Sequence, residues 1–134
     1  MDIVSPARRS EIMGRISSTG TKPELTVRKI AHSMGFRFRL HRQDLPGKPD
    51  LVFPGRKLAL FVHGCFWHRH EGCRFAYSPK SNIAFWQTKF NNNIVRDARA
   101  ERELERLGWR VAVIWECETK DFDGLRLKLR DILE

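Results

Sequence analysis

Residues 45–62 read LPGKPDLVFPGRKLALFV, and this stretch indicates the fold class. Residues 45–49 form a turn rich in proline and glycine, 50–53 a short strand, and 54–55 a second turn. Residues 57–62 are continuously apolar after the first lysine. Such a run is typical of a strand that is covered on both faces. The stretch therefore predicts two strands of a sheet with helices packed against it.

Helical patterns flank these strands on both sides. Thr21 is a good N-cap for a helix that ends at Gly35, and Ser81 and Gly108 bound a much longer one. The expected elements are helices 5–16 and 22–34, strands 36–41, 50–53 and 57–62, the long helix 82–107, a buried strand 109–115 and a closing helix 122–133. This order predicts an α/β single domain over residues 1–134, with a central mixed β-sheet flanked by helices.

The charge balance points to a polyanionic partner. The chain has 25 Lys and Arg against 16 Asp and Glu, a net charge of +9. A surplus of this size on one small domain is typical of nucleic-acid-binding proteins, and we expect the basic N-terminal segment 1–20 to contact DNA. No apolar run reaches the roughly 18 residues that a membrane span needs, and residues 1–6 lack the pattern of a signal peptide. We therefore expect a cytoplasmic protein without membrane contact.

Possible metal ligands are concentrated in residues 63–73, which contain three of the five histidines and two of the three cysteines. Thiolate and imidazole are the ligands that a structural Zn²⁺ prefers, in a closed tetrahedral site. The predicted zinc ligands are Cys65, His70, Cys73 and Cys117, and the last of these would tie the loop to the final strand. The alternative is three reduced thiols packed as small apolar groups beside surface histidines.

A second group of polar residues suits phosphodiester cleavage. Asp50 opens a strand after a turn, and a carboxylate there can bind Mg²⁺, which takes few protein ligands. His63 and His68 follow the next strand and are free to act on water, phosphate or a bound ion. Taken alone, Asp50 also reads as an ordinary turn aspartate. The two histidines favour a catalytic site.

The loop also carries large aromatic residues. Phe66 and Trp67 lie between the polar groups, and exposed aromatics beside a catalytic site can wedge between base pairs. The alternative is that they pack under the loop as a small core, which is also the default for Trp86 on the apolar face of its helix. Basic residues that include Lys48 are sufficient for phosphate contacts, although the long helix also reads as a solvated face.

The sequence resembles the very-short-patch-repair DNA mismatch endonucleases. The resemblance rests on the motifs at 45–50, 62–70, 108–111 and 115–117 and extends from about residue 10 to residue 118. It implies a restriction-endonuclease-like fold with a structural zinc. It also implies an enzyme that nicks duplex DNA on the 5′ side of the thymine in a T·G mismatch left by deamination of 5-methylcytosine.

The resemblance also implies roles for individual residues. Asp50 and the backbone carbonyl of Val62 would bind catalytic Mg²⁺, His68 would be the general base, and His63 would support the bound water or phosphate. Glu24 would lie near the site and orient a histidine. The zinc set is the one reached above from ligand chemistry. The DNA-contacting side chains would be Phe66, Trp67 and Trp86 beside the mismatched pair and Met13 from the minor groove.

Three hypotheses remain at this point. The first is a Mg²⁺-dependent, zinc-stabilised mismatch endonuclease, a bacterial cytoplasmic monomer on the nucleoid that is linked to a cytosine-5 DNA methyltransferase. The second is a restriction or defence nuclease of the same fold without mismatch specificity. The third is a zinc-stabilised DNA-binding module that cuts nothing, and the grouping of Asp50 with His63 and His68 argues against it.

Overall fold

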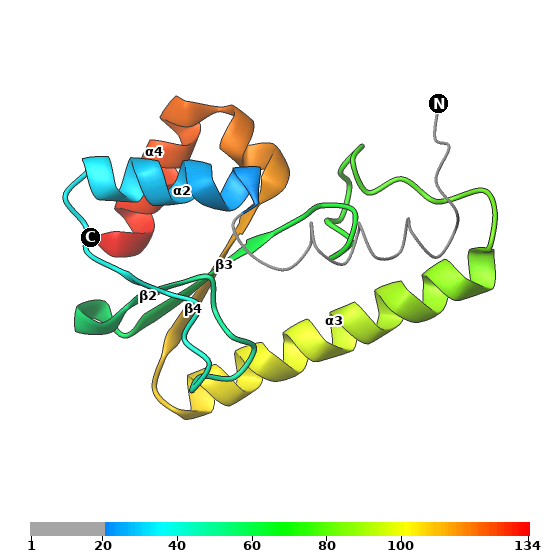
Figure 1. The fold of residues 1–134 in the computed structure, drawn as a ribbon, viewed down its shortest axis with the longest axis horizontal. Coiled ribbons are helices and arrows are strands. Elements are labelled where there is room, and N and C mark those ends of the chain that lie inside the picture. Colours follow the sequence, from blue (N-terminus) through cyan, green and yellow to red (C-terminus); the bar gives the residue numbers. More distant parts are fainter. Residues whose placement is uncertain (1–20) are drawn as a thin grey trace.

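The computed structural model describes residues 21–134 and shows a four-stranded mixed sheet in the order β1-β2-β3-β4 (Figure 1). The strands are β1 (Arg39–Leu40), β2 (Leu51–Phe53), β3 (Leu58–His63) and β4 (Arg110–Trp115). β1, β2 and β3 pair antiparallel, whereas β3 and β4 run parallel with Leu58 opposite Arg110 and His63 opposite Trp115. The parallel pair brings the carboxyl ends of β3 and β4, and the residues that follow them, to the same edge of the sheet.

Helices cover both faces of the sheet. α2 (Lys22–Ser33) and α4 (Phe122–Leu133) lie together on one side, and α3 (Ile83–Arg106) crosses the other side and extends beyond it (Figure 1). Short 3₁₀ turns, Pro54–Arg56 and Glu116–Lys120, follow β2 and β4. Thr21 caps α2 by accepting from the Glu24 N–H, and Gly35 follows the helix with φ of 88°. The predicted α/β class with a mixed sheet is confirmed.

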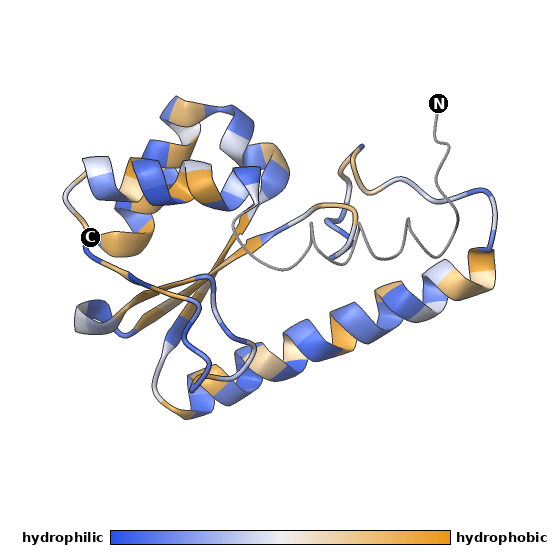
Figure 2. Cartoon of the chain, viewed as in Figure 1, coloured by the Kyte–Doolittle hydropathy of each residue, from blue (hydrophilic) through white to orange (hydrophobic). Residues whose placement is uncertain are grey.

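Two hydrophobic layers form because neighbouring residues of a strand face opposite sides. Leu58 and Leu60 pack with α2 and α4, whereas Ala59 packs with Leu104 of α3 on the other face. Figure 2 shows the strands as predominantly hydrophobic and α3 as mostly hydrophilic. The continuous apolar run of 57–62 is therefore explained by helices on both faces, as the sequence predicts.

Other details differ from the sequence prediction. The strand expected at 36–41 is paired only over Arg39–Leu40, and α3 begins after Asn82 rather than after Ser81. A strand forms at Arg110–Trp115, but the prediction that it is buried is wrong, because β4 is an edge strand of the described sheet and only Ile114 is buried. Ile83 and Ile94, expected on the buried face of the long helix, are exposed. The N-terminal part of α3 extends beyond the sheet (Figure 1).

No helix within residues 21–134 is both long enough and apolar enough to cross a bilayer. The expected helix 5–16 and the basic segment 1–20 lie outside the described residues, and so does Met13.

Candidate active site and metal centre

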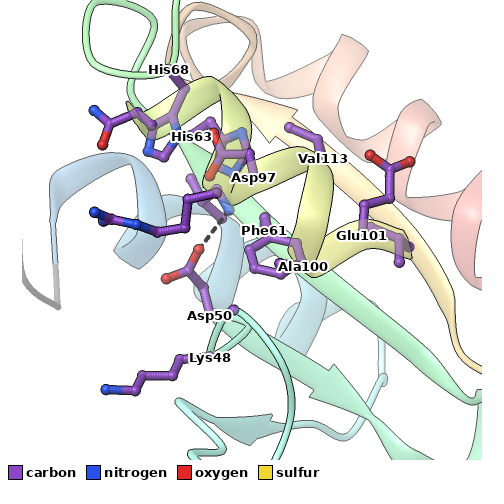
Figure 3. A pocket seen from close by; sticks show the side chains of 14 residues that line it. Lys48, Asp50, Phe61, His63, His68, Asp97, Ala100, Glu101 and Val113 are labelled. Atoms are coloured by element: carbon purple, nitrogen blue, oxygen red, sulfur yellow. Dashed lines mark hydrogen bonds and ion pairs between the residues drawn. The ribbon is translucent and has the colours of Figure 1, made fainter. Parts of the chain in front are cut away.

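A cavity of about 350 Å³ opens between the start of β2, the end of β3 and the inner face of α3. Figure 3 shows Lys48 and Asp50 on one side of it and His63, His68 and Asp97 on the other. We call it the Asp50 cavity. The structure thus brings together residues that the sequence motifs separate by almost fifty positions.

The turn before β2 is pressed against α3, and this contact sets the position of Asp50. Gly47 has φ of 73°, and a methyl group added there would lie 2.6 Å from Cβ of Ala100. Only glycine tolerates both the left-handed backbone and the close approach. Asp50 is then held by the backbone N–H of Val62, which donates to its Oδ2 at 2.7 Å. The carboxylate is fixed by one oxygen at the border of the cavity.

Acidic and basic groups from α2 and from the segment after β1 surround the Asp50 carboxylate. Glu24 is buried, and one of its oxygens, Oε2, contacts both Arg28 and His41 Nε2, the latter at 3.1 Å. Ligand atoms of Glu24, His41 and Asp50 lie within 4.8 Å of one another. Burial raises the pKa of Asp50 to about 6, and the charge of Glu24 adds to the increase, while the Val62 N–H opposes it. A cation would relieve this accumulation of negative charge.

His68 and His63 form a stacked pair opposite Asp50. Their ring centroids are 3.9 Å apart and the planes differ by 4°. His68 Nδ1 lies 2.6 Å from Oδ2 of Asp97 on α3, so the carboxylate can hold the ring with its Nε2 edge free. Burial, together with the nearby His68, lowers the pKa of His63 to about 4. His63 is therefore neutral at physiological pH.

The second centre is a cluster of three thiols and one imidazole, which we call the Cys/His cluster: Cys65, His70, Cys73 and Cys117. Their ligand atoms all lie within 4.8 Å of one another, and His70 Nδ1 is 3.7 Å from Cys65 Sγ and 3.5 Å from Cys117 Sγ. A tetrahedral zinc, with bonds of about 2.3 Å to sulfur and about 2.0 Å to nitrogen, keeps its ligands about 3.5 to 3.8 Å apart. The donor set and its spacing fit zinc.

The Cys/His cluster also has support around its ligands. The backbone N–H of Cys117 donates to Cys65 Sγ at 3.4 Å, as expected for the surroundings of a thiolate. Burial raises the pKa of the Cys65 thiol to about 12, so a bound cation is what would hold it as thiolate. The predicted set of four residues is thus a group that can bind a metal such as zinc.

Phe66, Trp67, Trp86 and Phe90 form an aromatic cluster between the loop and α3. Phe66 is at its centre, with ring centroids 5.3 Å from Trp67, 5.4 Å from Trp86 and 5.2 Å from Phe90. Phe90 is buried, whereas the other three are half-buried. The rings therefore pack together as the alternative reading of the sequence describes, while three of them remain partly exposed at the surface.

Arg69 fastens the loop beneath this aromatic cluster. Its guanidinium lies 4.1 Å from the centroid of Phe90 and donates to the backbone carbonyls of Phe66, Ala76 and Tyr77. Asn93 of α3 donates to the carbonyl of Trp67 at 3.1 Å. The loop between β3 and α3 is thereby held against the part of α3 that extends beyond the sheet (Figure 1).

Sequence reasoning missed several residues that border these groups. Asp97 was overlooked, although Asn93, Arg96, Asp97 and Ala100 follow a helical spacing of i, i+3, i+4 and i+7 and all line the Asp50 cavity. This spacing, which puts three polar residues on one face of the long helix, was the feature of the sequence that could have identified Asp97. His41, the histidine that contacts Glu24, carries no local signal, because its partner is 17 residues away.

Comparisons with known proteins bear on the chemistry of this site. The family model described as DNA mismatch endonuclease Vsr matches residues 1–74. The type II nicking enzyme V.XorIIP of Xanthomonas oryzae pv. oryzae is 53% identical over 99% of this chain and 97% of that protein. The DNA mismatch endonuclease Vsr of Escherichia coli is 37% identical over 92% of this chain and 79% of that protein.

A solved structure is similar in fold. The catalytic domain of the homing endonuclease I-Bth0305I superposes with a TM-score of 0.56 at 24% identity, covering 84% of this chain and 93% of that domain. The match supports the endonuclease-like fold that the motifs imply.

Proposed function

Since the chain belongs to the family of the DNA mismatch endonuclease Vsr, we propose that it nicks duplex DNA on the 5′ side of the thymine in a T·G mismatch. Its activity as a DNA nicking endonuclease follows from the family. The observation that carries the finer proposal is the Asp50 cavity, where a carboxylate faces a His–Asp pair and where Asn93, a lining residue, donates to the backbone of the half-buried Trp67.

Asp50 is the proposed ligand of a catalytic Mg²⁺, with the backbone carbonyl of Val62 beside it. Two observations support this fit. The Asp50 carboxylate supplies oxygen ligands and is held in place by one hydrogen bond from the Val62 N–H, and the nearby negative charge of Glu24 favours binding of a cation there. When bound, the ion would act as a Lewis acid on the scissile phosphate. Glu24, held by Arg28, would orient His41 near Asp50.

His68 is the proposed general base. Asp97 accepts from its Nδ1, which leaves Nε2 to take the proton of the attacking water. The oxygen of that water then bonds to phosphorus while the phosphodiester bond to the leaving oxygen breaks. His63, which is neutral and stacks on His68, would help to hold the phosphate or the attacking water in place. Lys48 lines the same cavity and would contact the DNA backbone.

Recognition of the mismatch is assigned to Phe66, Trp67 and Trp86. Their rings are grouped at one place on the surface and can enter a base step, where a mismatched pair costs less to unstack than a paired one. The proposed Met13 contact lies outside the described residues. Because T·G pairs arise when 5-methylcytosine deaminates, the enzyme would serve cells that contain a cytosine-5 DNA methyltransferase.

The zinc proposed for the Cys/His cluster has a structural role. Its four protein ligands close the coordination shell and leave no position for substrate. Cys117 follows β4, whereas the other three ligands follow β3, so the ion would join the ends of two parallel strands.

A strand-resolved cleavage assay tests the proposal. Labelled duplexes with one T·G pair in several sequence contexts, and fully paired controls, are incubated with Mg²⁺ and wild-type protein, Asp50→Ala or Asp44→Ala. Asp44 is exposed and pairs with Arg42 outside the cavity, so Asp44→Ala is the matched control. We expect a nick beside the thymine only in the mismatched duplex, lost in Asp50→Ala alone.

The second candidate is a nicking enzyme without mismatch dependence. This candidate is supported by two relatives, V.XorIIP and V.NmeAIP, which are 53% and 45% identical to this chain and are named type II nicking enzymes. Equal nicking of paired and mismatched duplexes would support this candidate and contradict the mismatch proposal.

A further inference from the structure

We propose that Trp115 is a positioning residue that couples the Cys/His cluster to the stacked pair of His63 and His68. This inference rests on the proposed catalytic roles of the two histidines. It adds to them a physical reason why a structural metal lies so close to the Asp50 cavity.

The coupling begins at a zinc ligand. The Trp115 ring lies face to face with His70, with centroids 4.2 Å apart and planes differing by 10°. His70 Nδ1 is the atom that approaches the sulfurs of Cys65 and Cys117. An ion bound there would fix the His70 ring, and the stacked indole would be fixed against it.

The same tryptophan reaches the proposed catalytic histidines. Trp115 is the register partner of His63 across the parallel strands β3 and β4, and its ring meets His63 edge to face at 5.3 Å. His63 in turn stacks on His68 at 3.9 Å. The aromatic neighbours of His63 are Phe61, His68 and Trp115, so packing sets the orientation of its ring.

The local sequence explains why one residue can serve both centres. From the last residue of β3 onward, the chain places His63 and His68 toward the Asp50 cavity and Cys65 and His70 in the Cys/His cluster. Trp115 ends β4 two residues before Cys117, so it lies between the two sets. If the Trp115 side chain were not held in place, the stacked rings of His63 and His68 could shift. Displacements of about 1 Å at a reacting group can lower the rate about 100-fold.

The test compares Trp115→Leu, which removes the aromatic face, with Trp115→Phe, which keeps one. The matched control is Trp109→Leu directly before the same strand, where the ring packs against the hydrophobic cluster that contains Leu104. Each protein is assayed for zinc per chain, for affinity toward a T·G duplex, and for single-turnover nicking with enzyme in excess.

We expect Trp115→Leu to keep its zinc and to bind the duplex within about twofold of wild type, while its single-turnover rate falls about 10- to 100-fold. Trp115→Phe should recover most of the rate, and Trp109→Leu should nick at the wild-type rate. A wild-type rate in zinc-loaded Trp115→Leu, or no recovery in Trp115→Phe, overturns the proposal.

A measurement on the wild-type protein covers the case in which Trp115→Leu does not fold. In the zinc-loaded protein, nuclear Overhauser contacts must join the indole protons of Trp115 to ring protons of both His63 and His70. Their absence overturns the proposal. Failure of the wild-type protein to nick T·G duplexes would instead contradict the proposed function, and these contacts would still test the arrangement around Trp115.

Discussion

Replacing Asp50 by asparagine is expected to stabilise the protein while abolishing its nicking activity. The carboxylate is positioned by Val62 in a partly desolvated site beside Glu24, and its pKa rises from 3.8 to about 6. Asp50→Asn keeps an oxygen that can accept from the Val62 N–H but removes the charge. The substitution therefore isolates the electrostatic cost of the proposed metal ligand.

The size of the effect follows from the pKa. At about 1.36 kcal/mol per pKa unit, the ionised carboxylate lowers the free energy of unfolding by about 3 kcal/mol at neutral pH. Because the group borders an open cavity, water screens part of this cost, and a gain of about 1 to 3 kcal/mol is expected. The pKa of Asp50 is higher in the folded state than in the unfolded state. The stability that the protonated carboxyl group contributes to the wild-type protein is therefore fully present below about pH 4 and is lost as pH rises through about 6.

The assay is urea unfolding of wild type and Asp50→Asn at about pH 5 and about pH 8, with zinc retained and no added Mg²⁺. The difference in free energy of unfolding between Asp50→Asn and wild type should be clearly larger at the higher pH. Added Mg²⁺ should reduce this difference by stabilising only the wild type. Asp44→Asn is the control: hydrogen bonding to Arg42 lowers the pKa of Asp44, so its removal should not stabilise at the higher pH. An Asp50→Asn variant no more stable than wild type at about pH 8 would refute the reasoning.

Three further outcomes are expected. Asp97→Asn should reduce single-turnover nicking about 100-fold or more with unchanged DNA affinity, because the amide cannot hold the His68 ring as the carboxylate does, and an undiminished rate would contradict the role of the pair. Loading zinc into the apo-protein should release at least two protons near pH 7, since burial raises the pKa of both Cys65 and Cys117; calorimetry in buffers of different ionisation enthalpy measures this, and zinc uptake without proton release would argue against thiolate ligation. Gly47→Ala should lower the free energy of unfolding by more than about 1 kcal/mol in urea titrations, because the new methyl group meets Ala100 at a left-handed backbone position, and a neutral result would show that the turn can move away from α3.

The local sequence was sufficient for features that depend on neighbours along the chain. The apolar run of 57–62 predicts a strand with both faces covered, and its alternate residues do pack on helices of opposite layers. The candidate ligands Cys65, His70 and Cys73 lie within nine residues, so loop geometry alone keeps them close, and Cys117 could be added because it lies two residues after a strand. Ligand chemistry does not depend on distant contacts, which is why the sequence alone could select four residues that the structure places in one cluster able to bind a metal.

Tertiary structure decided which groups act on one another. The partnership of His68 with Asp97 spans 29 positions, and that of Glu24 with His41 spans 17, so neither has a local signature. The sequence also did not reveal that apolar residues of α3 are exposed and that most of β4 is only half-buried, because a helical or strand period identifies an apolar face but does not show what covers it. Residue types determined the chemistry available to this protein. The parallel pairing of β3 with β4 and the packing of α3 on the sheet determined which of those residues meet, because only packing brings together side chains that are far apart in the chain.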